Sequence, residues 1–308
     1  MTLAFGGDVH FEGVDRSRLA ANPQTAVGPI ADVLRRADLA MVNLETAVTT
    51  RGTPAPKRFV FRAPPTAFLA LRSAGIDVAT QANNHGMDYG EVGLRDSLAA
   101  AADAKFPVVG IGADEAAAFA PWITTVHGER IAVLGATQVL DANLIAAWTA
   151  GPAKPGLASA KDEPLLLSAV REARSQADVV VVYLHWGTEM HTCPTAPQQA
   201  LARALADAGA DVVVGSHAHV LLGAGRLAST YVSYGLGNFV FYARSGPTLE
   251  SGVLTLTLQG RTVRAAEWSP ARIAGGVPVP LTGAAAAAAG RDWVRLRSCT
   301  GLAALPSS

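Results

Sequence analysis

Side chains that can bind metal ions occur at five places in the chain, and each place directly follows an apolar run typical of a buried β-strand. The first run is 3–5 and the last is 212–215. In a parallel sheet the carboxyl ends of the strands lie along one edge, where ligands bind. We therefore expect one shared metal site, with the candidate ligands Asp8, His10, Glu45, Asn84, His185, His217 and His219.

The residue types at these places indicate which metals the site would take. The Asp-x-His pair at 8–10 offers a carboxylate oxygen and an imidazole nitrogen, a mixture that suits Mn, Zn, Fe or Mg better than Ca. Taken singly, this pair also fits a helix cap beside a surface histidine, Glu45 fits a cap, and 83–85 fits a turn. The His-x-His pair at 217–219 is harder to explain structurally, and the joint occurrence at five strand ends favours a functional site.

Carboxylates and histidines in this number suit two metal ions better than one. A bridging carboxylate, which we expect to be Glu45, can hold two cations about 3.5–4 Å apart. The remaining ligands of one ion would be Asp8, His10 and His219, and those of the other would be Asn84, His185 and His217. His85 adjoins a ligand without being needed as one, so it is free for general acid or base chemistry.

The elements that must position these residues follow from the apolar pattern of the first third of the chain. Amphipathic stretches at 26–34, 67–73 and 92–104 alternate with short β-branched runs. Such alternation is typical of right-handed βαβ units and a mainly parallel sheet.

The later part of the chain shows other patterns. Residues 122–138 predict two strands around a four-residue turn, hence an antiparallel hairpin. Residues 141–161, which include Trp148, predict a long surface loop that would serve as a lid. The successive strands predicted from 231 to 273 indicate a second sheet that faces the first.

We expect a single domain over 1–275 and a C-terminal tail over 276–308 that packs on it, with a short docking helix at 293–296. The chain has 308 residues, of which 50% are apolar and 16% charged, which is enough for one large α/β core. Its formal net charge of zero argues against nucleic acid or an anionic membrane as a partner.

The sequence also predicts where the protein works. Cys193 and Cys299 are the only cysteines, and two cysteines so far apart do not resemble a disulfide framework. The sequence leaves a disulfide between them undecided, but a reducing compartment fits better. The first predicted strand begins at Thr2, which leaves no room for a signal peptide or anchor, and no apolar run is long enough to span a membrane. We expect a cytoplasmic protein; its oligomeric state does not follow from the sequence.

The chain carries, in this order, the motifs Gly-Asp-x-His, Asn-Leu-Glu, Ala-Asn-Asn-His-x-x-Asp-Tyr-Gly, His-Trp-Gly-x-Glu, Gly-Ser-His-x-His and Tyr-Gly-Leu-Gly-Asn-Phe. Over residues 3 to about 242 they resemble those of the CapA family, the poly-γ-glutamate capsule biosynthesis proteins. This family is similar to the calcineurin-like metallophosphoesterases. The resemblance implies a four-layer α/β/β/α sandwich with two facing mixed sheets and two divalent metal ions held by the residues assigned above.

The sequence departs from these families at three places. Asn43-Leu44-Glu45 stands where metallophosphoesterases carry a Gly-Asp-x-x-Asp motif, so the bridging role of Glu45 is inferred from position. CapA proteins usually carry an N-terminal membrane anchor, which we do not expect here. His191 and Cys193 are additions after the His-Trp-Gly-x-Glu motif.

Two enzyme functions fit the site, and one is a hydrolase of phosphoesters or of amides such as poly-γ-glutamate. Its water would be activated by two metal ions, and His85 would protonate the leaving group. A phosphatase would also need cationic clamps, for which Lys57, Arg58 and Arg62 are candidates, although a solvated loop explains them equally well.

The favoured function is a metal-dependent peptide epimerase (an isomerase). Chains of this kind without an anchor look similar to the lasso-peptide epimerase that inverts a C-terminal tryptophan. Metal ions bound to the C-terminal carboxylate of a peptide would acidify the adjacent Cα–H. His85 on one face, and His191 or the Cys193 thiolate on the other, would then remove and return the proton. A binding module with a vestigial metal site is the third interpretation, which the filled ligand positions disfavour.

Overall fold

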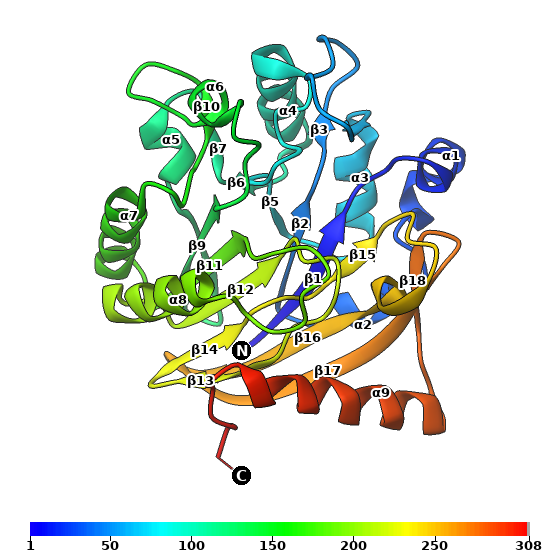
Figure 1. Cartoon of the computed structure of the whole chain (residues 1–308), viewed down its shortest axis with the longest axis vertical. Coiled ribbons are helices and arrows are strands. Elements are labelled where there is room, and N and C mark those ends of the chain that lie inside the picture. Colours follow the sequence, from blue (N-terminus) through cyan, green and yellow to red (C-terminus); the bar gives the residue numbers. More distant parts are fainter. Residues whose placement is uncertain (307–308) are drawn as a thin grey trace.

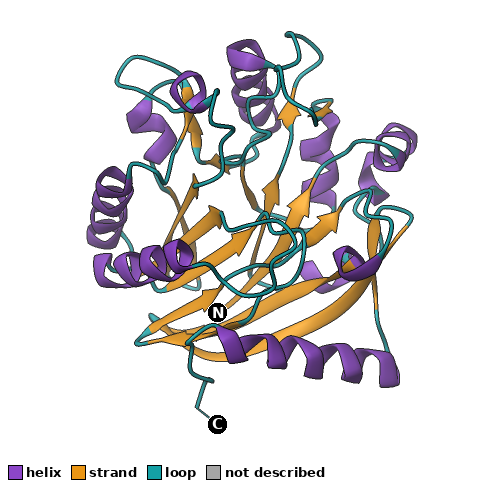
Figure 2. Cartoon of the chain, in the orientation of Figure 1, coloured by secondary structure: helices purple, strands orange, loops and turns teal. Residues whose placement is uncertain are grey.

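Two facing β-sheets with helices on their outer faces make up the computed structural model, which describes residues 1–306 (Figures 1 and 2). The first sheet runs in the order β18-β17-β16-β1-β2-β5-β6, with β15 paired to β1. The second runs β13-β14-β12-β11-β9-β8. This is the expected four-layer α/β/β/α sandwich with two mixed sheets, so the predicted fold class is confirmed.

The strands of the first sheet are β1 (Thr2–Val9), β2 (Leu39–Leu44), β5 (Val78–Thr80), β6 (Val108–Val109), β15 (Asn238–Val240), β16 (Glu250–Gln259), β17 (Thr262–Ala274) and β18 (Val277–Pro280). Those of the second are β8 (Trp122–Val126), β9 (Glu129–Thr137), β11 (Val179–His185), β12 (Val212–Ser216), β13 (Ala224–Leu227) and β14 (Thr230–Ser233). Two small pairs are β3 (Ala47–Val48) with β4 (Arg62–Ala63), and β7 (Ile111–Gly112) with β10 (Gly156–Leu157).

The α-helices are α1 (Val14–Ala21), α2 (Ala31–Leu34), α3 (Thr66–Ser73), α4 (Gly90–Ala104), α5 (Glu115–Phe119), α6 (Ile145–Trp148), α7 (Glu163–Gln176), α8 (Ala196–Ala208) and α9 (Gly283–Arg295). Short 3₁₀ helices are η1 (Pro23–Thr25), η2 (Gly246–Leu249) and η3 (Leu296–Cys299). The expected helices at 67–73 and 92–104 are present as α3 and α4.

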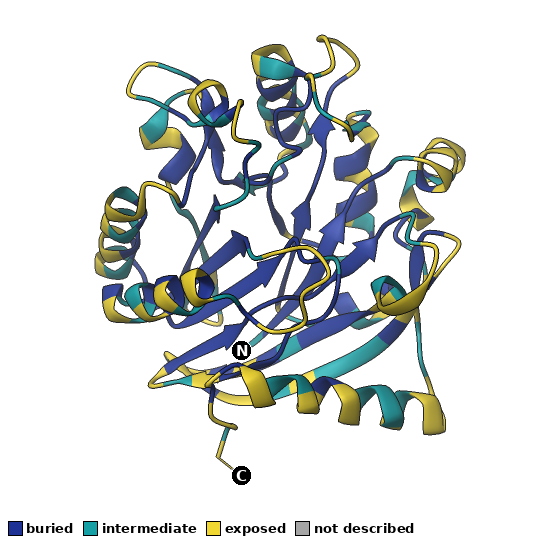
Figure 3. Cartoon of the chain, viewed as in Figure 1, coloured by how far each residue is buried: buried dark blue, intermediate teal, exposed yellow. Residues whose placement is uncertain are grey.

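The central strands are continuous apolar runs because both of their faces are covered (Figure 3). Between the sheets, Phe5 and Met41 of the first belong to the same core as Val181 and Tyr183 of the second. The outer faces pack against helices, α1 to α4 over the first sheet and α7 with α8 over the second. Strands buried on both faces have fixed ends, which is what a site built on those ends requires.

Two glycines allow the backbone to pack closely behind the strand ends. A Cβ on Gly7 would lie 1.9 Å from the carbonyl oxygen of Gly237, so β1 and β15 could not approach each other. A Cβ on Gly215 would lie 2.0 Å from Nε1 of Trp186, whose N–H donates to the carbonyl of Tyr234 at 2.9 Å. These glycines of the Gly-Asp and Gly-Ser motifs are therefore required for packing.

Three local predictions need correction. The strands between 238 and 274 do not form the second sheet: β16 pairs antiparallel with β1 and extends the first sheet, while only β14 of the predicted group joins the second. The turn between β8 and β9 has two residues rather than four. Residues 26–34 hold only the single turn of α2, because Gly28-Pro29 interrupts the periodicity before it.

The segment 141–161 is not a free lid. It contains α6 and β10, and Trp148 is 4% exposed in a core with Met87, Leu94 and Leu157. Its apolar residues therefore belong to a small packed layer next to α4, and the prediction of an open surface loop is wrong.

The C-terminal segment packs on the first sheet, as Figure 1 shows for α9 beneath β17. Trp293, in the stretch predicted as a docking helix, stacks on Trp268 of β17 with ring centroids 5.3 Å apart. The division predicted at 275 falls between β17 and β18, so the first strand of the tail is itself part of the sheet. In the described part of the chain, no helix is long and apolar enough to cross a membrane.

Asp15 of α1 is a buried carboxyl that is 1% exposed, and neither of its oxygens has a hydrogen-bond partner. It faces Gly276 in the turn between β17 and β18, where an added Cβ would lie 2.1 Å from Oδ1. Burial raises the pKa of Asp15 to about 7, and Arg18 opposes this only in part.

We predict that Asp15→Asn stabilises the protein more at pH 8 than at pH 5. The folded-state pKa of Asp15 lies above the unfolded-state value of about 3.9, so its contribution to stability is complete below that value and is lost as the pH rises through 7. Asparagine stays neutral and avoids the loss. Thermal unfolding at both pH values measures it, with the exposed Asp103→Asn as control; equal shifts for Asp15→Asn at both pH values would contradict the prediction.

Candidate metal centre

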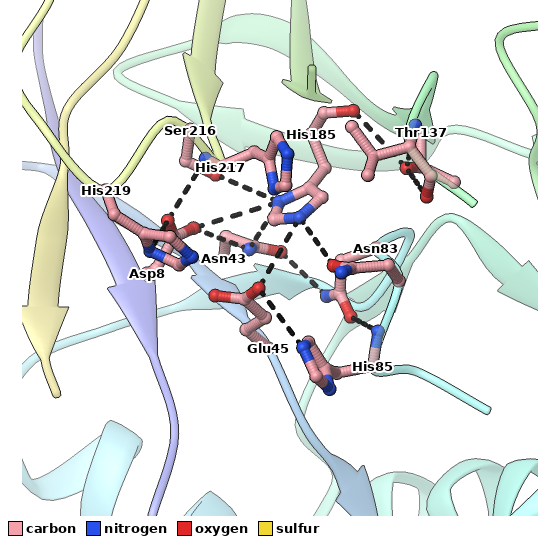
Figure 4. A network of polar contacts seen from close by, with 12 residues as sticks. Asp8, Asn43, Glu45, Asn83, His85, Thr137, His185, Ser216, His217 and His219 are labelled. Atoms are coloured by element: carbon pink, nitrogen blue, oxygen red, sulfur yellow. Dashed lines mark hydrogen bonds and ion pairs between the residues drawn. The ribbon is translucent and has the colours of Figure 1, made fainter. Parts of the chain in front are cut away.

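The five predicted strand ends meet at one place in the structure, at the carboxyl edge of both sheets (Figure 4). Asp8 lies near the end of β1, Glu45 just beyond β2, His185 at the end of β11, and both histidines of the 217–219 turn just beyond β12. Asn84 and His85 follow β5. The structure thus brings together side chains that are up to 211 positions apart, from Asp8 to His219.

Asp8 is fully buried and connects the two sheets. Its Oδ1 accepts a hydrogen bond from the Asn43 amide at 2.7 Å, and its Oδ2 accepts one from the backbone N–H of His217 at 3.0 Å. Nδ1 of His185 and Nδ1 of His219 each lie 3.8 Å from this carboxylate. One anion therefore fixes the positions of groups from β2, β11 and the turn after β12.

His185 and Asn84 face the same point. Nε2 of His185 lies 2.9 Å from Oδ1 of Asn84 and 3.5 Å from Oε1 of Glu45, while its Nδ1 lies 3.1 Å from the amide nitrogen of Asn43. The same Asn43 accepts from Asn83, which also donates to the carbonyl of Leu44. Asn43 and Asn83 are thus supporting residues that fix the orientation of the ligand candidates.

Several buried donor and acceptor atoms at this place have no hydrogen-bond partner: Oε1 and Oε2 of Glu45, Nδ1 of His217 and Nε2 of His10. Buried polar groups are nearly always paired, so a set of orphaned ligand atoms calls for an explanation. Within residues 1–306, three groups of side chains bring ligand atoms within 4.8 Å of one another: Glu45, His185 and His217; Asp8, Glu45 and His219; and Glu189, His217 and His219. This donor set fits divalent cations.

The shifted pKa values of the candidate ligands also favour a metal site. Burial raises the pKa of Glu45 well above its usual range, and the Asp8 carboxylate raises it further. Burial also raises the pKa of Asp8, against an opposing effect of His219. Burial lowers the pKa of His217 to about 3, and it lowers that of His185 as well, where His217 adds to the effect. Neutral histidines can coordinate a metal ion, and bound cations would offset the negative charge of the clustered carboxylates.

The turn that carries His217 and His219 has unusual backbone geometry. These residues have φ angles of 100° and 57°, although neither is glycine. Left-handed conformations of this kind cost about 1–3 kcal/mol each and cluster at functional sites. Nδ1 of His219 also lies 2.8 Å from Oδ1 of Asn238, which orients the ring and leaves Nε2 free.

His10 is buried at the same edge, but it lies outside the three groups of ligand atoms. Its ring lies 4.0 Å from Phe241, 4.4 Å from Tyr242 and 4.6 Å from Phe61, centroid to centroid. Its Nδ1 accepts from the backbone N–H of Glu12 at 3.1 Å. The role of His10 as a ligand stays a prediction.

His85 is held by a partner that the sequence analysis overlooked. Its Nδ1 lies 2.6 Å from Oδ2 of Asp88, and its Nε2 lies 3.9 Å from Oε1 of Glu45. Burial lowers the pKa of His85, and Lys57 lowers it further. The signal for this pair was present in the motif Asn-His-x-x-Asp, whose histidine and aspartate are three residues apart.

Lys57 is not on a solvated loop. Its side chain is 7% exposed, and Nζ lies 3.0 Å from Asp88 and 3.5 Å from Asp141 and also contacts the carbonyl of Asn84. Two carboxylates thus surround the one ammonium. Lys57 supports the His85–Asp88 pair, which is a different role from the phosphate clamp that the sequence suggested.

The two candidates for a second base, Cys193 and His191, lie on the exposed segment that follows β11. Cys193 forms a disulfide with Cys299, so it offers no thiolate, and its predicted role as a base is wrong for this oxidised form. His191 is exposed, and its side chain is in none of the ligand groups of residues 1–306. A disulfide is typical of oxidising compartments, so it weighs against the cytoplasmic location, which stays a prediction.

Known structures place this fold in a class. The chain is similar to a putative 5'-nucleotidase from Staphylococcus aureus, solved in complex with alpha-ketoglutarate, with a TM-score of 0.52 and 16% identity over 95% of this chain and 58% of that one. At this identity the likeness concerns the fold alone, which is metallophosphoesterase-like. The candidate metal centre lies at the strand ends of this fold.

The chain belongs to the family described as "Bacterial capsule synthesis protein PGA_cap", whose model matches residues 2–243. The "PGA biosynthesis protein CapA" of Bacillus subtilis is 32% identical over 288 residues, which cover 91% of this chain and 74% of that protein. The "Capsule biosynthesis protein CapA" of Bacillus anthracis is 35% identical over 218 residues, which cover 70% of this chain and 52% of that protein. The chain therefore matches only about half the length of the second relative.

We predict that Glu45→Gln removes more bound Mn²⁺ than any single histidine substitution at the site. Glu45 belongs both to the group with Asp8 and His219 and to the group with His185 and His217, so a neutral amide there weakens both positions. Metal content after dialysis, measured by mass spectrometry, gives the comparison, with the exposed Glu172→Gln as the matched control. Equal losses for Glu45→Gln and His217→Ala would argue against a bridge.

Proposed function

We propose that the protein is a divalent-metal-dependent hydrolase that cleaves an amide bond in a peptide or a glutamyl polymer. One observation carries this proposal: His85 with its partner Asp88 is a proton-transfer group beside Glu45 at the edge of the donor cluster, whereas Cys193, a candidate for the opposite base, is disulfide-bonded. Hydrolysis needs one such group, whereas epimerisation with inversion needs one on each face of the substrate. Cations held by the cluster would polarise the scissile carbonyl and acidify water.

The geometry of His85 fits the transfer of a proton during amide hydrolysis. The 2.6 Å contact holds one proton between Nδ1 and Asp88, which leaves Nε2 as an acceptor. Its lowered pKa keeps the ring neutral, so Nε2 can take a proton from the attacking water. Asp88 and the imidazolium then attract each other, and the same proton passes to the leaving nitrogen, which departs as an amine.

The charges around the site favour an amide over a phosphate ester. The ammonium of Lys57 is engaged by Asp88 and Asp141. The guanidinium of Arg62 lies 3.6 Å from the ring centroid of Tyr89, and that of Arg58 lies over Phe59. The three cations considered as phosphate clamps thus have other partners, and an amide needs none. The names of the relatives, which concern PGA and capsule biosynthesis, agree with a glutamyl substrate.

Epimerisation of a C-terminal residue in a peptide natural product is the second candidate, including the lasso-peptide reaction. The specific observation in its favour is aromatic: Phe61 stacks on His85 with centroids 3.9 Å apart, and Tyr242 lies beside His10. Aromatic rings next to a proton-transfer group suit an aromatic end residue. Its second base would have to be a residue other than the disulfide-bonded Cys193.

The candidates separate in one experiment with Mn²⁺-loaded protein in D₂O. Poly-γ-glutamate and a peptide ending in tryptophan are incubated separately, and new amines and deuterium at Cα are measured; bis(p-nitrophenyl) phosphate is the third substrate. We expect new amines without deuterium at Cα. Deuterium uptake without cleavage would establish epimerisation instead, and release of p-nitrophenol alone would establish a phosphoesterase.

We predict that His85→Ala keeps near-normal metal content and lowers the rate of cleavage by roughly 10²–10⁴, the range for a positioned acid or base. Asp88→Asn should lower the rate less, since the imidazole remains. The matched control is His127→Ala, because His127 is exposed and pairs only with Asp38 at the surface. A loss of metal as large as that of His217→Ala would make His85 a ligand.

A further inference from the structure

The segment between β11 and α8, residues 186–195, is here called the Glu189 loop. Its carboxylate at Glu189 lies within 4.8 Å of ligand atoms of both His217 and His219, although the residue itself is exposed. The charge of Glu189 also contributes to the raised pKa of Glu45. No step of the proposed reaction uses this carboxylate, and it is not among the ligands that the sequence predicts.

The loop is bonded directly to the turn that carries the two histidines. The backbone N–H of Met190 donates to the carbonyl of Ala218 at 2.9 Å, and Ala218 stands between His217 and His219. Met190 has a φ of 62°, a left-handed conformation that a non-glycine residue adopts at a cost. A contact that sustains this conformation positions the neighbouring Glu189 next to the histidines.

The far end of the loop is tied down by the disulfide. Cys193 is bonded to Cys299, 106 residues later, at the end of η3. That segment is fixed in turn, because Trp293 of α9 stacks on Trp268 and the backbone of Ala303 pairs with that of Arg226. Both cysteines are exposed, so a soluble dithiol can reach the bond.

We propose that Glu189 is an additional ligand of the metal centre, on the side where His217 and His219 lie, and that the Cys193–Cys299 disulfide keeps it in place, so that reduction of this bond weakens metal binding. In the reduction, a dithiol gives two electrons and two protons; the S–S bond breaks, two thiols form, and the dithiol becomes a cyclic disulfide. Once the bond is broken, part of the binding free energy is used to order the loop each time Glu189 binds the ion, so the affinity for the metal falls. This inference rests on the metal site that the proposed function uses, and not on which bond is cleaved.

The test measures Mn²⁺ affinity by calorimetry on the metal-free full-length protein. Relative to the oxidised wild type, we expect Glu189→Gln and the double variant C193S/C299S each to weaken one Mn²⁺ site about tenfold, as the loss of a supporting interaction does. Because both act through one carboxylate, the triple variant should bind like Glu189→Gln, without a further tenfold loss. The control is Glu172→Gln, an exposed glutamate on α7.

Each other outcome overturns the proposal. Unchanged Mn²⁺ affinity in Glu189→Gln would show that Glu189 is not a ligand. Unchanged affinity in C193S/C299S would show that the disulfide does not affect metal binding. A loss of about a hundredfold in the triple variant would show that the two effects are independent. A wild type that binds no Mn²⁺ overturns this proposal together with the metal centre, whereas a wild type that binds Mn²⁺ but cleaves nothing overturns only the proposed function.

A second measurement avoids the serine variants, in case they fold poorly. If reduction weakens Mn²⁺ binding tenfold, linkage requires that saturating Mn²⁺ stabilises the disulfide by the same factor. The midpoint potential of the Cys193–Cys299 pair should then become more negative by about 30 mV, the value of a tenfold change for two electrons. Alkylation of thiols in glutathione buffers gives this potential; an equal potential with and without Mn²⁺ would contradict the coupling.

Discussion

The buried Asp8 carboxylate is the interaction on which the rest of the site depends. It sits where the two sheets come together, and its two oxygens are bonded to Asn43 of the first sheet and to the His217 backbone of the second. Burial of a carboxylate is costly unless it is paired, and here the hydrogen bonds and the adjacent histidines offset that cost. A buried charge that would by itself destabilise the protein thus connects the two sheets. Divalent cations bound there would neutralise the negative charge that remains.

The layers of helices and strands around Asp8 hold it in a fixed position and shield it from solvent. Strands covered on both faces fix the ends from which the ligand candidates project, and close contacts at Gly7 and Gly215 leave no space behind them. Around the cluster lie groups that orient and groups that react: Asn43 and Asn83 hold His185 in position, while Asp88 and Lys57 hold His85. The site therefore has a metal-binding half and a proton-transfer half that share Glu45 as their boundary.

The meeting of the strand ends follows from apolar runs and from the geometry of parallel strands, and the same pattern predicts an α/β domain with two sheets, whereas the four layers follow from the resemblance to the CapA family. The sequence does not predict which sheet β16 joins, since antiparallel pairing with β1 is a long-range choice that no local pattern encodes. The sequence does not predict the burial of Trp148 and of the Lys57 ammonium either, because that burial depends on neighbours distant in sequence. The Cys193–Cys299 bridge likewise requires two segments 106 residues apart to meet. Because the bridge occupies Cys193, it removes one of the two candidates for a second base, which supports the proposed hydrolysis over epimerisation.

The central claim is that the five strand ends form one dinuclear metal centre. Crystals of the protein soaked in Mn²⁺ and measured at the manganese absorption edge test it most directly. We expect two anomalous peaks about 3.5–4 Å apart, with Glu45 between them, Asp8 and His219 on one ion, and His185 and His217 on the other. No peak at this edge of the sheets, or one held without Glu45, would contradict it.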